Sequence, residues 1–252
     1  MNEPARPLAP AFYATSTTPT RSAWADWWVL LHPPYTLWHL SYVAIGASLA
    51  PRFDGGRLVA TLIAFFLAVG VCAHNLDELH DRPLRTQIPA WLLVATAVAS
   101  LAGAVALGVV GIARIGPGLI VFIVAGVVLT CGYNLEMFGG RLHNDVTFAA
   151  AWGAFPVLTG YYAQAETLRL PALAAAGAAY GLSSAQRSLS KPARTLRRHV
   201  RAIDGTVTYD DGHQQQLTTT SLIAPLEAAL QATAAAVVAL AVALVIYRTA
   251  TP

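Results

Sequence analysis

Seven apolar stretches, each close to the length that crosses a bilayer, set the strongest limit on the fold of this chain. They cover residues 35–51, 58–79, 89–113, 117–135, 146–165, 170–186 and 222–247. A membrane-spanning helix needs about 20 apolar residues, and backbone inside hydrocarbon must satisfy its own hydrogen bonds, which favours helices. The composition agrees, because 56% of the residues are hydrophobic and only 12% are charged. We therefore expect an all-α, polytopic helical membrane bundle with about seven transmembrane helices.

The N-terminal segment differs in composition from the rest of the chain. Residues 1–25 are rich in Pro, Thr and Ala and contain no continuous apolar stretch, which is not the pattern of a secretory signal peptide. We expect a disordered cytoplasmic tail over residues 1–25 and a helical membrane domain over residues 26–252, with Trp27 and Trp28 as an interfacial anchor. Residues 187–218 are expected to form a basic cytoplasmic connection that contains a hairpin, a lid or a plain linker.

The basic residues predict the orientation of the bundle, because cytoplasmic loops retain Lys and Arg. Eleven of the sixteen lie in the tail or in the connections after the second, fourth and sixth apolar stretches. We therefore expect the N-terminus in the cytoplasm and, after seven crossings, the C-terminus on the opposite side. The end of the second stretch, the loop after the fourth and the basic connection then share the cytoplasmic face, which is predicted to carry the active site.

Acidic side chains at the end of the second apolar stretch are the main candidates for chemistry, because ionised groups near hydrocarbon are costly and usually functional. His74, Asp77 and Asp81 follow one another at intervals of three and four residues, so on a helix they share one face. Oxygen ligands at a helix end suit Mg²⁺, which keeps several waters and shares itself with a phosphate. The spacing therefore predicts a metal site formed by Asp77 and Asp81.

Two neighbours of these acids favour an ordinary structural explanation. Glu78 and His80 are interpreted as parts of a solvated loop, with Arg82 and Arg85 as ion-pair partners. For these side chains we expect exposure to solvent rather than a role in catalysis.

The segment that starts at Asp77 resembles the first aspartate motif of the UbiA superfamily of intramembrane prenyltransferases. In that family an Asn-Asp pair is followed by two further Asp at i+3 and i+7, and then by an Arg-Pro-Leu segment. Here Asp77, Asp81 and Arg82-Pro83-Leu84 match the later part, which leaves Ala73-His74 in the place of the Asn-Asp pair. A second alignment makes Asn75 the motif Asn, with Asp77-Glu78 as its acids.

Two further segments carry the resemblance less specifically. His32-Pro33-Pro34-Tyr35-Thr36 is similar to the Arg-Pro segment that opens many family members, with His in place of Arg. Tyr133-Asn134 resembles the family's Tyr-containing cytoplasmic segment, where the expected basic residue is Met137 and Arg141 is a substitute for it. The resemblance covers approximately residues 30–200.

The resemblance implies a cytoplasm-facing cavity in which Mg²⁺ holds the diphosphate of a prenyl donor, while the prenyl tail runs into a lipid-accessible tunnel. The implied activity is transfer of the prenyl group to an unidentified acceptor, or a related ionisation of the prenyl diphosphate. Asp77, Asp81 and Tyr133 would be catalytic, and His74 would assist the two acids as a metal ligand. The implied substrate-binding residues are Asn75, Arg82, Asn134, Arg141, Arg187 and Lys191. Membrane lipid is the other expected partner, and no nucleic-acid module is present in the sequence.

The sequence departs from the family at the second aspartate motif. No acid occurs between Ser183 and Arg201, and the family bundle usually has nine spans rather than seven. One interpretation is a basic face that binds phosphate directly, formed by Arg187, Lys191, Arg194 and Arg198. Pro192 argues against an unbroken helix there. The other interpretation is a basic run, including Arg197, Arg198 and Arg201, that fixes orientation and contacts anionic headgroups.

Two other classes of function remain open. A transition-metal membrane enzyme could use a His and carboxylate site drawn from His39, His74, Glu136, His143 and Asp145. A chain that has lost the second motif could instead be a non-catalytic protein that binds an isoprenoid or acts as a membrane scaffold, since a fold does not guarantee chemistry.

Overall fold

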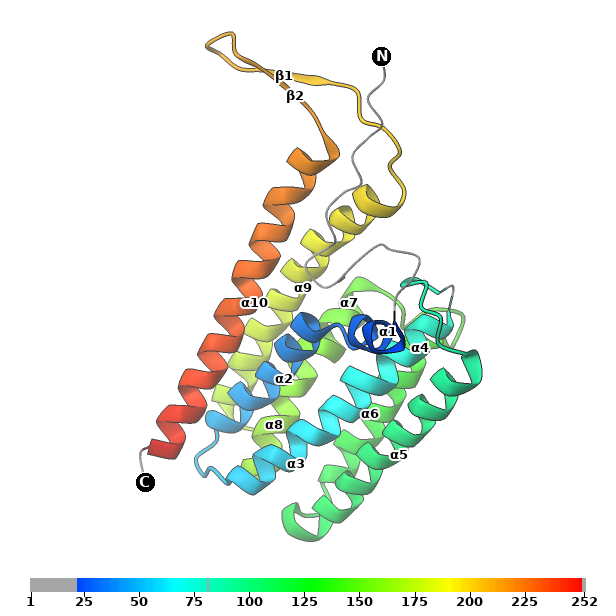
Figure 1. Ribbon diagram of the computed structural model, residues 1–252. Coiled ribbons are helices and arrows are strands. Elements are labelled where there is room, and N and C mark those ends of the chain that lie inside the picture. The colour runs from blue at the N-terminus through cyan, green and yellow to red at the C-terminus, as the bar shows by residue number, and fades with distance from the viewer. Residues whose placement is uncertain (1–21, 81, 251–252) are drawn as a thin grey trace.

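The structure, a computed structural model, describes residues 22–80 and 82–250 and consists mostly of helices packed side by side (Figure 1). The predicted all-α class is confirmed, and each of the seven apolar stretches coincides with a helix. In chain order the elements are α1 (Ala23–Leu30), α2 (Pro33–Ser48), α3 (Gly55–Phe65), η1 (Phe66–Ala73), α4 (His74–Leu79), α5 (Ala90–Ile115), α6 (Leu119–Asn134), α7 (Asp145–Ala149), η2 (Ala150–Ala154), α8 (Phe155–Ala165), α9 (Leu170–Arg198), β1 (Thr206–Thr208), β2 (Gln214–Gln216) and α10 (Thr219–Ala250).

Three helices of the described chain are long and apolar enough to cross a membrane. They are Gly55–Leu79, in which α3, η1 and α4 are continuous, Ala90–Ile115 and Thr219–Ala250, and the apolar helix Leu119–Asn134 is shorter. These helices are compatible with a membrane protein. The full number of about seven crossings and the cytoplasmic placement of the N-terminus stay predictions.

The start of the helical domain lies earlier than predicted. Helix α1 begins at Ala23, because Ser22 adopts an extended conformation and its Oγ accepts a hydrogen bond from the Ala25 N–H at 3.3 Å. A Ser at this position satisfies one of the backbone donors that a helix start leaves unpaired. A disordered tail that reaches residue 25 is therefore wrong at its C-terminal end, and residues 1–21 lie outside the described residues.

The first part of the basic connection is helical, because α9 continues as one helix to Arg198 with Pro192 inside it. A proline removes one backbone donor and normally disturbs the preceding turn. Here both Pro192 and Ser188, whose carbonyl loses its usual donor, are exposed. Water can take the missing donor's place, so the expected break at Pro192 is wrong and the basic residues share one helix.

The short strands β1 and β2 form a hairpin, which was one of the three predictions for residues 187–218. Thr206 pairs with Gln216 in an antiparallel register, and Gly212 has a positive φ of 83° in the turn, a conformation that glycine adopts without strain. The hairpin projects beyond α9 and α10, away from the rest of the bundle (Figure 1). None of its residues lines the cavity described below.

Helix α2 lies at the centre of the bundle and packs closely against α8 and α10. At Gly46 of α2 an added Cβ would overlap the backbone of Val157, and at Gly160 of α8 it would overlap the backbone of Val43. These reciprocal glycines let the two helix backbones touch, as small residues do between membrane helices. The contact fixes α8, and with it the η2 segment that forms one wall of the cavity.

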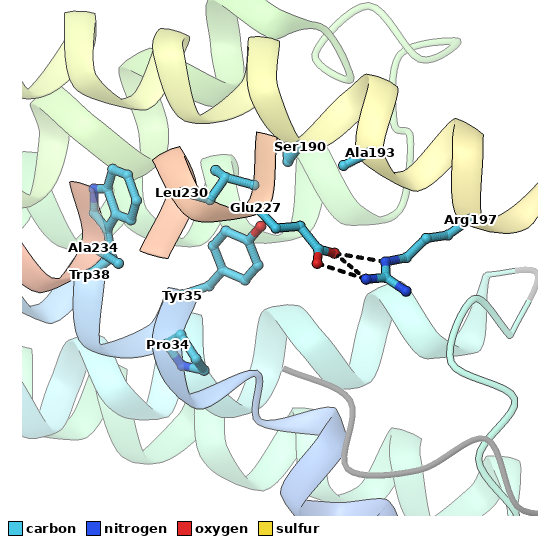
Figure 2. A pocket seen from close by; sticks show the side chains of 9 residues that line it. All are labelled: Pro34, Tyr35, Trp38, Ser190, Ala193, Arg197, Glu227, Leu230 and Ala234. Carbon is cyan, nitrogen blue, oxygen red and sulfur yellow. Dashed lines mark hydrogen bonds and ion pairs between the residues drawn. The ribbon is translucent and has the colours of Figure 1, made fainter. Parts of the chain in front are cut away.

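An ion pair between Arg197 and Glu227 joins α9 to α10 (Figure 2). Arg197 donates from Nε and from one terminal nitrogen to the carboxylate of Glu227, at 2.7 Å in each case. Both side chains are largely buried, with 15% and 19% exposed. The bidentate geometry is the strong form of this contact. Arg197 therefore fixes the helix pair and is not available for the headgroup contact considered from the sequence.

Candidate functional site

A polar cavity of about 320 Å³ lies where α4, α6 and α9 end, beside the turn between α1 and α2. It is lined from the end of the second apolar stretch, the loop after the fourth and the basic part of α9, so the predicted meeting of these three segments is confirmed. Its lining residues are His32, Tyr35, His39, Val69, Ala73, His74, Asp77, Pro83, Leu84, Tyr133, Asn134, His143, Phe148, Trp152, Gln186, Arg187, Ser190, Arg194 and Arg198.

Five of the residues predicted for the site line this cavity: His74, Asp77, Tyr133, Asn134 and Arg187. The first two come from α4, which continues directly from the π-helix η1. A π-helix has more residues per turn than an α-helix and therefore shifts the face that the following residues present. In the resulting register His74 and Asp77 reach the cavity, whereas Asn75 and Glu78 lie buried on another side of the helix.

The cavity does not include four other predicted residues. The Asn75 amide donates to the Val71 carbonyl of its own helix at 2.8 Å. The Arg82 guanidinium donates to the Ile88 carbonyl at 2.7 Å, within the loop that follows α4. The remaining two are Arg141, which is exposed, and Lys191, which is 67% exposed and lies 3.7 Å from a carboxylate oxygen of Asp145. Asp81 lies outside the described residues.

Glu78 is a structural residue of the bundle, so its assignment to a solvated loop is wrong. Its side chain is fully buried, and its carboxylate accepts hydrogen bonds from the Leu84 N–H, the Thr86 N–H and the Thr86 hydroxyl, each at 2.9 Å. A buried carboxylate needs such donors to offset its desolvation. Asp26 of α1, also buried, accepts the Gln87 N–H at 2.7 Å. Two buried acids therefore hold the loop that borders the cavity.

The interpretation of His80 as exposed agrees with the structure. Its side chain is 53% exposed, and its Nε2 lies 3.8 Å from Glu136, which in turn lies 3.9 Å from His143. Arg82 and Arg85 were expected to pair with these residues, but the Arg82 guanidinium donates to the backbone carbonyls of Thr86 and Ile88. A backbone carbonyl and a surface acid can each satisfy an arginine, and sequence spacing does not distinguish them.

Three histidines of the cavity are held in a defined tautomer. The Nδ1 atoms of His39, His74 and His143 contact the carbonyls of Trp152, Gly70 and Tyr133 at 2.8, 3.0 and 3.1 Å. A carbonyl oxygen only accepts, so each Nδ1 carries a proton. In the neutral ring, Nε2 is then left with its lone pair, ready to accept a proton or to bind a metal ion.

The basic wall of the cavity comes from one face of α9. Arg187 is oriented by Asp145, with 2.9 Å between Nε and Oδ1, and lies over the ring of Phe148 at 5.0 Å. Arg194 and Arg198 follow seven and eleven residues later on the same helix and also line the cavity. These two belong to the basic face that the spacing predicted, although they were not among the substrate-binding residues drawn from the family resemblance.

His32 lies in the turn between α1 and α2, near Arg194 and Arg198. Burial, and then the nearby His74, Arg198 and Arg194, lower the pKa of His32 well below its usual range. Its ring centroid lies 5.0 Å from that of His74. At neutral pH His32 is therefore uncharged, and the cationic charge that a bound anion would meet comes from the arginines.

An apolar pocket of about 610 Å³ adjoins the polar cavity. It lies between the α3–η1 helix, α5, α6 and the η2–α8 helix, and it shares two lining residues, Val69 and Trp152, with the cavity. Its other aromatic residues are Phe65, Phe122 and Phe155. A site with arginines and a carboxylate at one end and an apolar pocket behind them suits an amphiphile with an anionic headgroup and a long tail.

The described residues contain no group of three or more His, Cys, Asp or Glu side chains placed to hold one metal ion. The cavity does offer Asp77, an oxygen ligand.

Comparisons with protein-family models, curated proteins and solved structures gave no match. The resemblance to the UbiA superfamily thus rests on the motif residues alone.

Proposed function

We propose that this chain is a membrane enzyme that binds a prenyl diphosphate and, with Mg²⁺, ionises it or transfers its prenyl group to an acceptor. The observation that carries the proposal is that two unlike spaces, a polar cavity with an arginine wall and an apolar pocket, share the lining residues Val69 and Trp152. The cavity takes the diphosphate and the pocket takes the tail.

The arginine wall supports binding of the diphosphate. Arg187, Arg194 and Arg198 line the cavity, and guanidinium groups form strong charge-assisted hydrogen bonds to phosphate oxygens. The family resemblance calls for a second aspartate motif at this helix, with metal ions that neutralise the diphosphate. In this chain the arginines supply that positive charge directly.

Asp77 supports a role for Mg²⁺. A Mg²⁺ ion usually keeps several waters and is bound through one or two carboxylates plus substrate phosphates, so a single cavity carboxylate fits an ion that is shared with a diphosphate. Asp81 is proposed as the second carboxylate. When bound, the ion neutralises charge that develops on the leaving diphosphate.

Aromatic rings at the boundary of the two spaces support the chemical step. The rings of Tyr133 and Trp152 lie 5.9 Å apart and nearly perpendicular, and Trp152 borders both the cavity and the pocket. In the proposed reaction the allylic C–O bond breaks, the electron pair leaves with the diphosphate, and the acceptor attacks the carbon and loses a proton. Ring faces stabilise the cationic carbon in between.

The test is release of inorganic diphosphate from geranylgeranyl diphosphate by the purified full chain, with a membrane lipid extract as the source of acceptor. We expect Mg²⁺-dependent release that falls at least tenfold in Asp77→Asn and is unchanged in Arg141→Ala, a substitution at an exposed residue outside the cavity. Equal release by the wild type and Asp77→Asn would contradict the metal assignment. Binding without any release would favour the non-catalytic isoprenoid-binding protein.

A transition-metal enzyme is the second candidate, and the histidine tautomers favour it. His39, His74 and His143 each donate Nδ1–H to a backbone carbonyl, which is how proteins commonly orient a metal-ligating histidine. Glu136 and Asp145, the carboxylates considered with them, do not line the cavity. Retention of Fe, Mn or Zn by the purified chain through dialysis, together with no effect of prenyl diphosphate, would favour this candidate over the first.

A further inference from the structure

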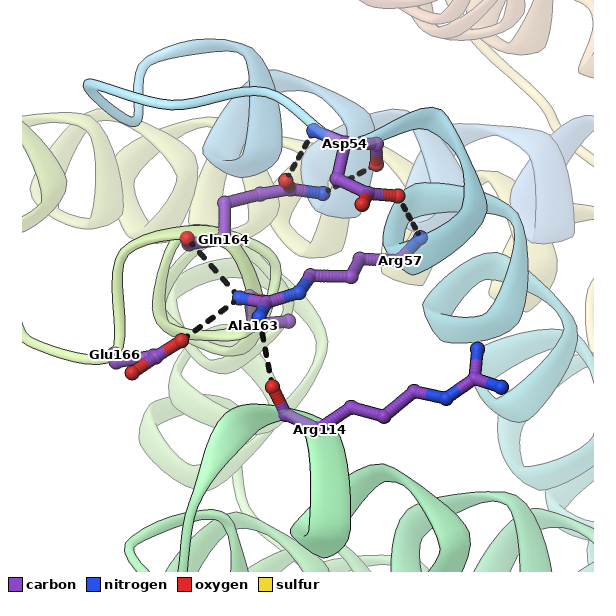
Figure 3. Close-up of polar contacts among 6 residues, drawn as sticks. All are labelled: Asp54, Arg57, Arg114, Ala163, Gln164 and Glu166. Carbon is purple, nitrogen blue, oxygen red and sulfur yellow. Dashed lines mark hydrogen bonds and ion pairs between the residues drawn. The ribbon is translucent and has the colours of Figure 1, made fainter.

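The apolar pocket ends, at the side opposite the polar cavity, in a polar clamp centred on Arg57 (Figure 3). One terminal nitrogen of Arg57 donates to the Arg114 carbonyl at 2.7 Å. The other lies 3.2 Å from the Ala163 carbonyl and 3.1 Å from a carboxylate oxygen of Glu166. A single guanidinium therefore joins the start of α3 to the ends of α5 and α8.

Further contacts hold this clamp in place. The Asp54 N–H donates to the side-chain oxygen of Gln164 at 2.7 Å, and the Gln164 amide donates back to the Asp54 carbonyl at 3.0 Å. Asp54 also caps α3, since its carboxylate accepts the Arg57 N–H at 2.9 Å. The positive charge of Arg57 lies at the C-terminal ends of two helices, where cations are favoured.

The clamp forms the floor of the pocket. Asp54, Arg57, Arg114 and Ala163 line the pocket at this end, while Val69 lines it where the pocket meets the polar cavity. Polar groups that are already hydrogen-bonded to one another, and one charge among them, are a poor environment for a hydrocarbon tail. This end of the pocket is therefore unfavourable for a hydrocarbon tail.

The length of the pocket follows from the helix that lines it throughout. Arg57 and Val69 are twelve residues apart in the continuous helix Gly55–Leu79, and a rise of about 1.5 Å per residue gives about 18 Å. An extended polypeptide advances about 3.5 Å over the three bonds of a residue, or roughly 1.2 Å per bond. An isoprenoid unit with four chain bonds therefore covers about 4.8 Å. The pocket accommodates about four such units.

We propose that the Arg57 clamp is a specificity determinant that limits the prenyl tail to about four isoprenoid units. The inference rests on the proposed function, because it takes the polar cavity as the diphosphate site. Arg57 acts by position, as the floor against which the tail ends, and has no part in the chemical step.

The experiment measures dissociation constants of the detergent-solubilised full chain for inorganic diphosphate and for geranyl, farnesyl, geranylgeranyl and hexaprenyl diphosphates, all with Mg²⁺. For the wild type we expect affinity to rise severalfold with each added unit up to geranylgeranyl, with no further gain for hexaprenyl diphosphate. In Arg57→Ala the floor opens, and hexaprenyl diphosphate is expected to bind at least tenfold more tightly relative to geranylgeranyl than it does in the wild type.

A second variant tests the same inference without breaking the clamp. Ala64 lines the pocket between its two ends. In Ala64→Phe we expect the affinity to stop rising already at geranyl or farnesyl diphosphate, while the affinity for inorganic diphosphate is retained. Ala106→Phe is the matched control, since Ala106 is exposed on α5 and is not a lining residue. Its profile is expected to match that of the wild type.

The outcomes separate the inference from the function on which it rests. Tight binding of all the diphosphates, with the same dependence on tail length in the wild type and in Ala64→Phe, would overturn the tail limit and leave the proposed function standing. An affinity that still rises from geranylgeranyl to hexaprenyl diphosphate in the wild type would overturn it as well. If neither inorganic diphosphate nor any prenyl diphosphate bound, both the proposed function and the tail limit would fail.

Discussion

The two ends of the apolar pocket both carry arginines, but they use them differently. At the Arg57 clamp the guanidinium is engaged with protein oxygens at the ends of α5 and α8. At the polar cavity Arg187, Arg194 and Arg198 line the same space as Asp77, with Arg187 also ion-paired to Asp145. The comparison shows that an arginine near a membrane helix end is informative only together with its surroundings, because the same side chain can close a bundle or form the wall of a binding site.

A similar contrast separates two neighbouring acids on α4. Glu78 is fully buried and accepts three hydrogen bonds from its loop, whereas Asp77 is exposed to the cavity. Substitutions that remove structural charge are therefore expected to lower stability, and substitutions that remove cavity charge are expected to lower ligand affinity. The predictions below test this separation, from the largest expected effect to the smallest.

Glu78→Ala is expected to lower the free energy of unfolding by about 3 kcal/mol or more, because three buried donors on Leu84 and Thr86 lose their acceptor. Denaturant titration of the detergent-solubilised protein measures the change. Asp77→Ala is the matched control and is expected to change stability by less than about 1 kcal/mol. An equal loss of unfolding free energy in Glu78→Ala and Asp77→Ala would contradict the assignment of Glu78 as the structural acid and Asp77 as the cavity acid.

Arg198→Ala is expected to weaken binding of inorganic diphosphate by roughly tenfold to a hundredfold, because a hydrogen bond to a charged group contributes about 1.5–3 kcal/mol. Its unfolding midpoint without ligand should stay close to that of the wild type. Isothermal titration gives the affinity. An unchanged dissociation constant, or the same loss in Arg141→Ala outside the cavity, would mean that the α9 face does not bind the anion.

Arg197→Ala, one residue from Arg198, is expected to show the opposite pattern. It leaves Glu227 unpaired in a largely buried position, and breaking such a pair destabilises a protein by up to about 3 kcal/mol. The affinity for inorganic diphosphate should be retained at temperatures where the variant is folded. Thermal unfolding and titration together test this, and a lost affinity with unchanged stability would reverse the roles of the two arginines.

The smallest expected effect is on the pH dependence of stability. The lowered pKa of His32 means that the unfolded chain binds a proton near the usual value of 6.5 while the folded chain stays neutral. Stability is therefore full above about pH 6.5 and falls as the pH drops below that value. His32→Asn, which tolerates the positive φ of 43° at this position, should lose less stability between pH 7 and pH 5 than the wild type. Thermal unfolding at both pH values measures the difference, and an equal loss in both proteins would contradict it.

The helices and the meeting of three segments at one end could be predicted from the sequence, because hydrophobic length and the distribution of basic residues determine both. The basic face of α9 could also be predicted from the spacing of its arginines. The spacing also placed Asp77 at the site, but the burial of Glu78 could not be predicted. Whether Asp77 or Glu78 reaches the cavity depends on the register that the π-helix η1 imposes on α4, and a sequence pattern does not reveal one extra residue in a turn.

Residues whose partners are backbone atoms were also beyond sequence reasoning. Arg82 lies in the motif-like segment, yet its guanidinium contacts the Ile88 carbonyl of its own loop, a contact that depends on the loop conformation. Asp26, near the predicted tail, is buried and holds the Gln87 N–H. Pro192 suggested a helix break. The helix continues because Pro192 and Ser188 are exposed to water, and this exposure could not be known from the sequence.

The central claim is that the polar cavity and the apolar pocket bind one amphiphile together with Mg²⁺. Its most direct test is the thermal unfolding midpoint of the detergent-solubilised protein in EDTA or Mg²⁺, with geranylgeranyl diphosphate, inorganic diphosphate or geranylgeraniol. At a hundredfold excess over the dissociation constant, geranylgeranyl diphosphate with Mg²⁺ should raise the midpoint by about 5–10 °C. Inorganic diphosphate alone and geranylgeraniol alone should each raise the midpoint less. Arg198→Ala should reduce the shift that geranylgeranyl diphosphate causes. An equal shift with geranylgeraniol, or no shift with any of these ligands, would contradict the claim.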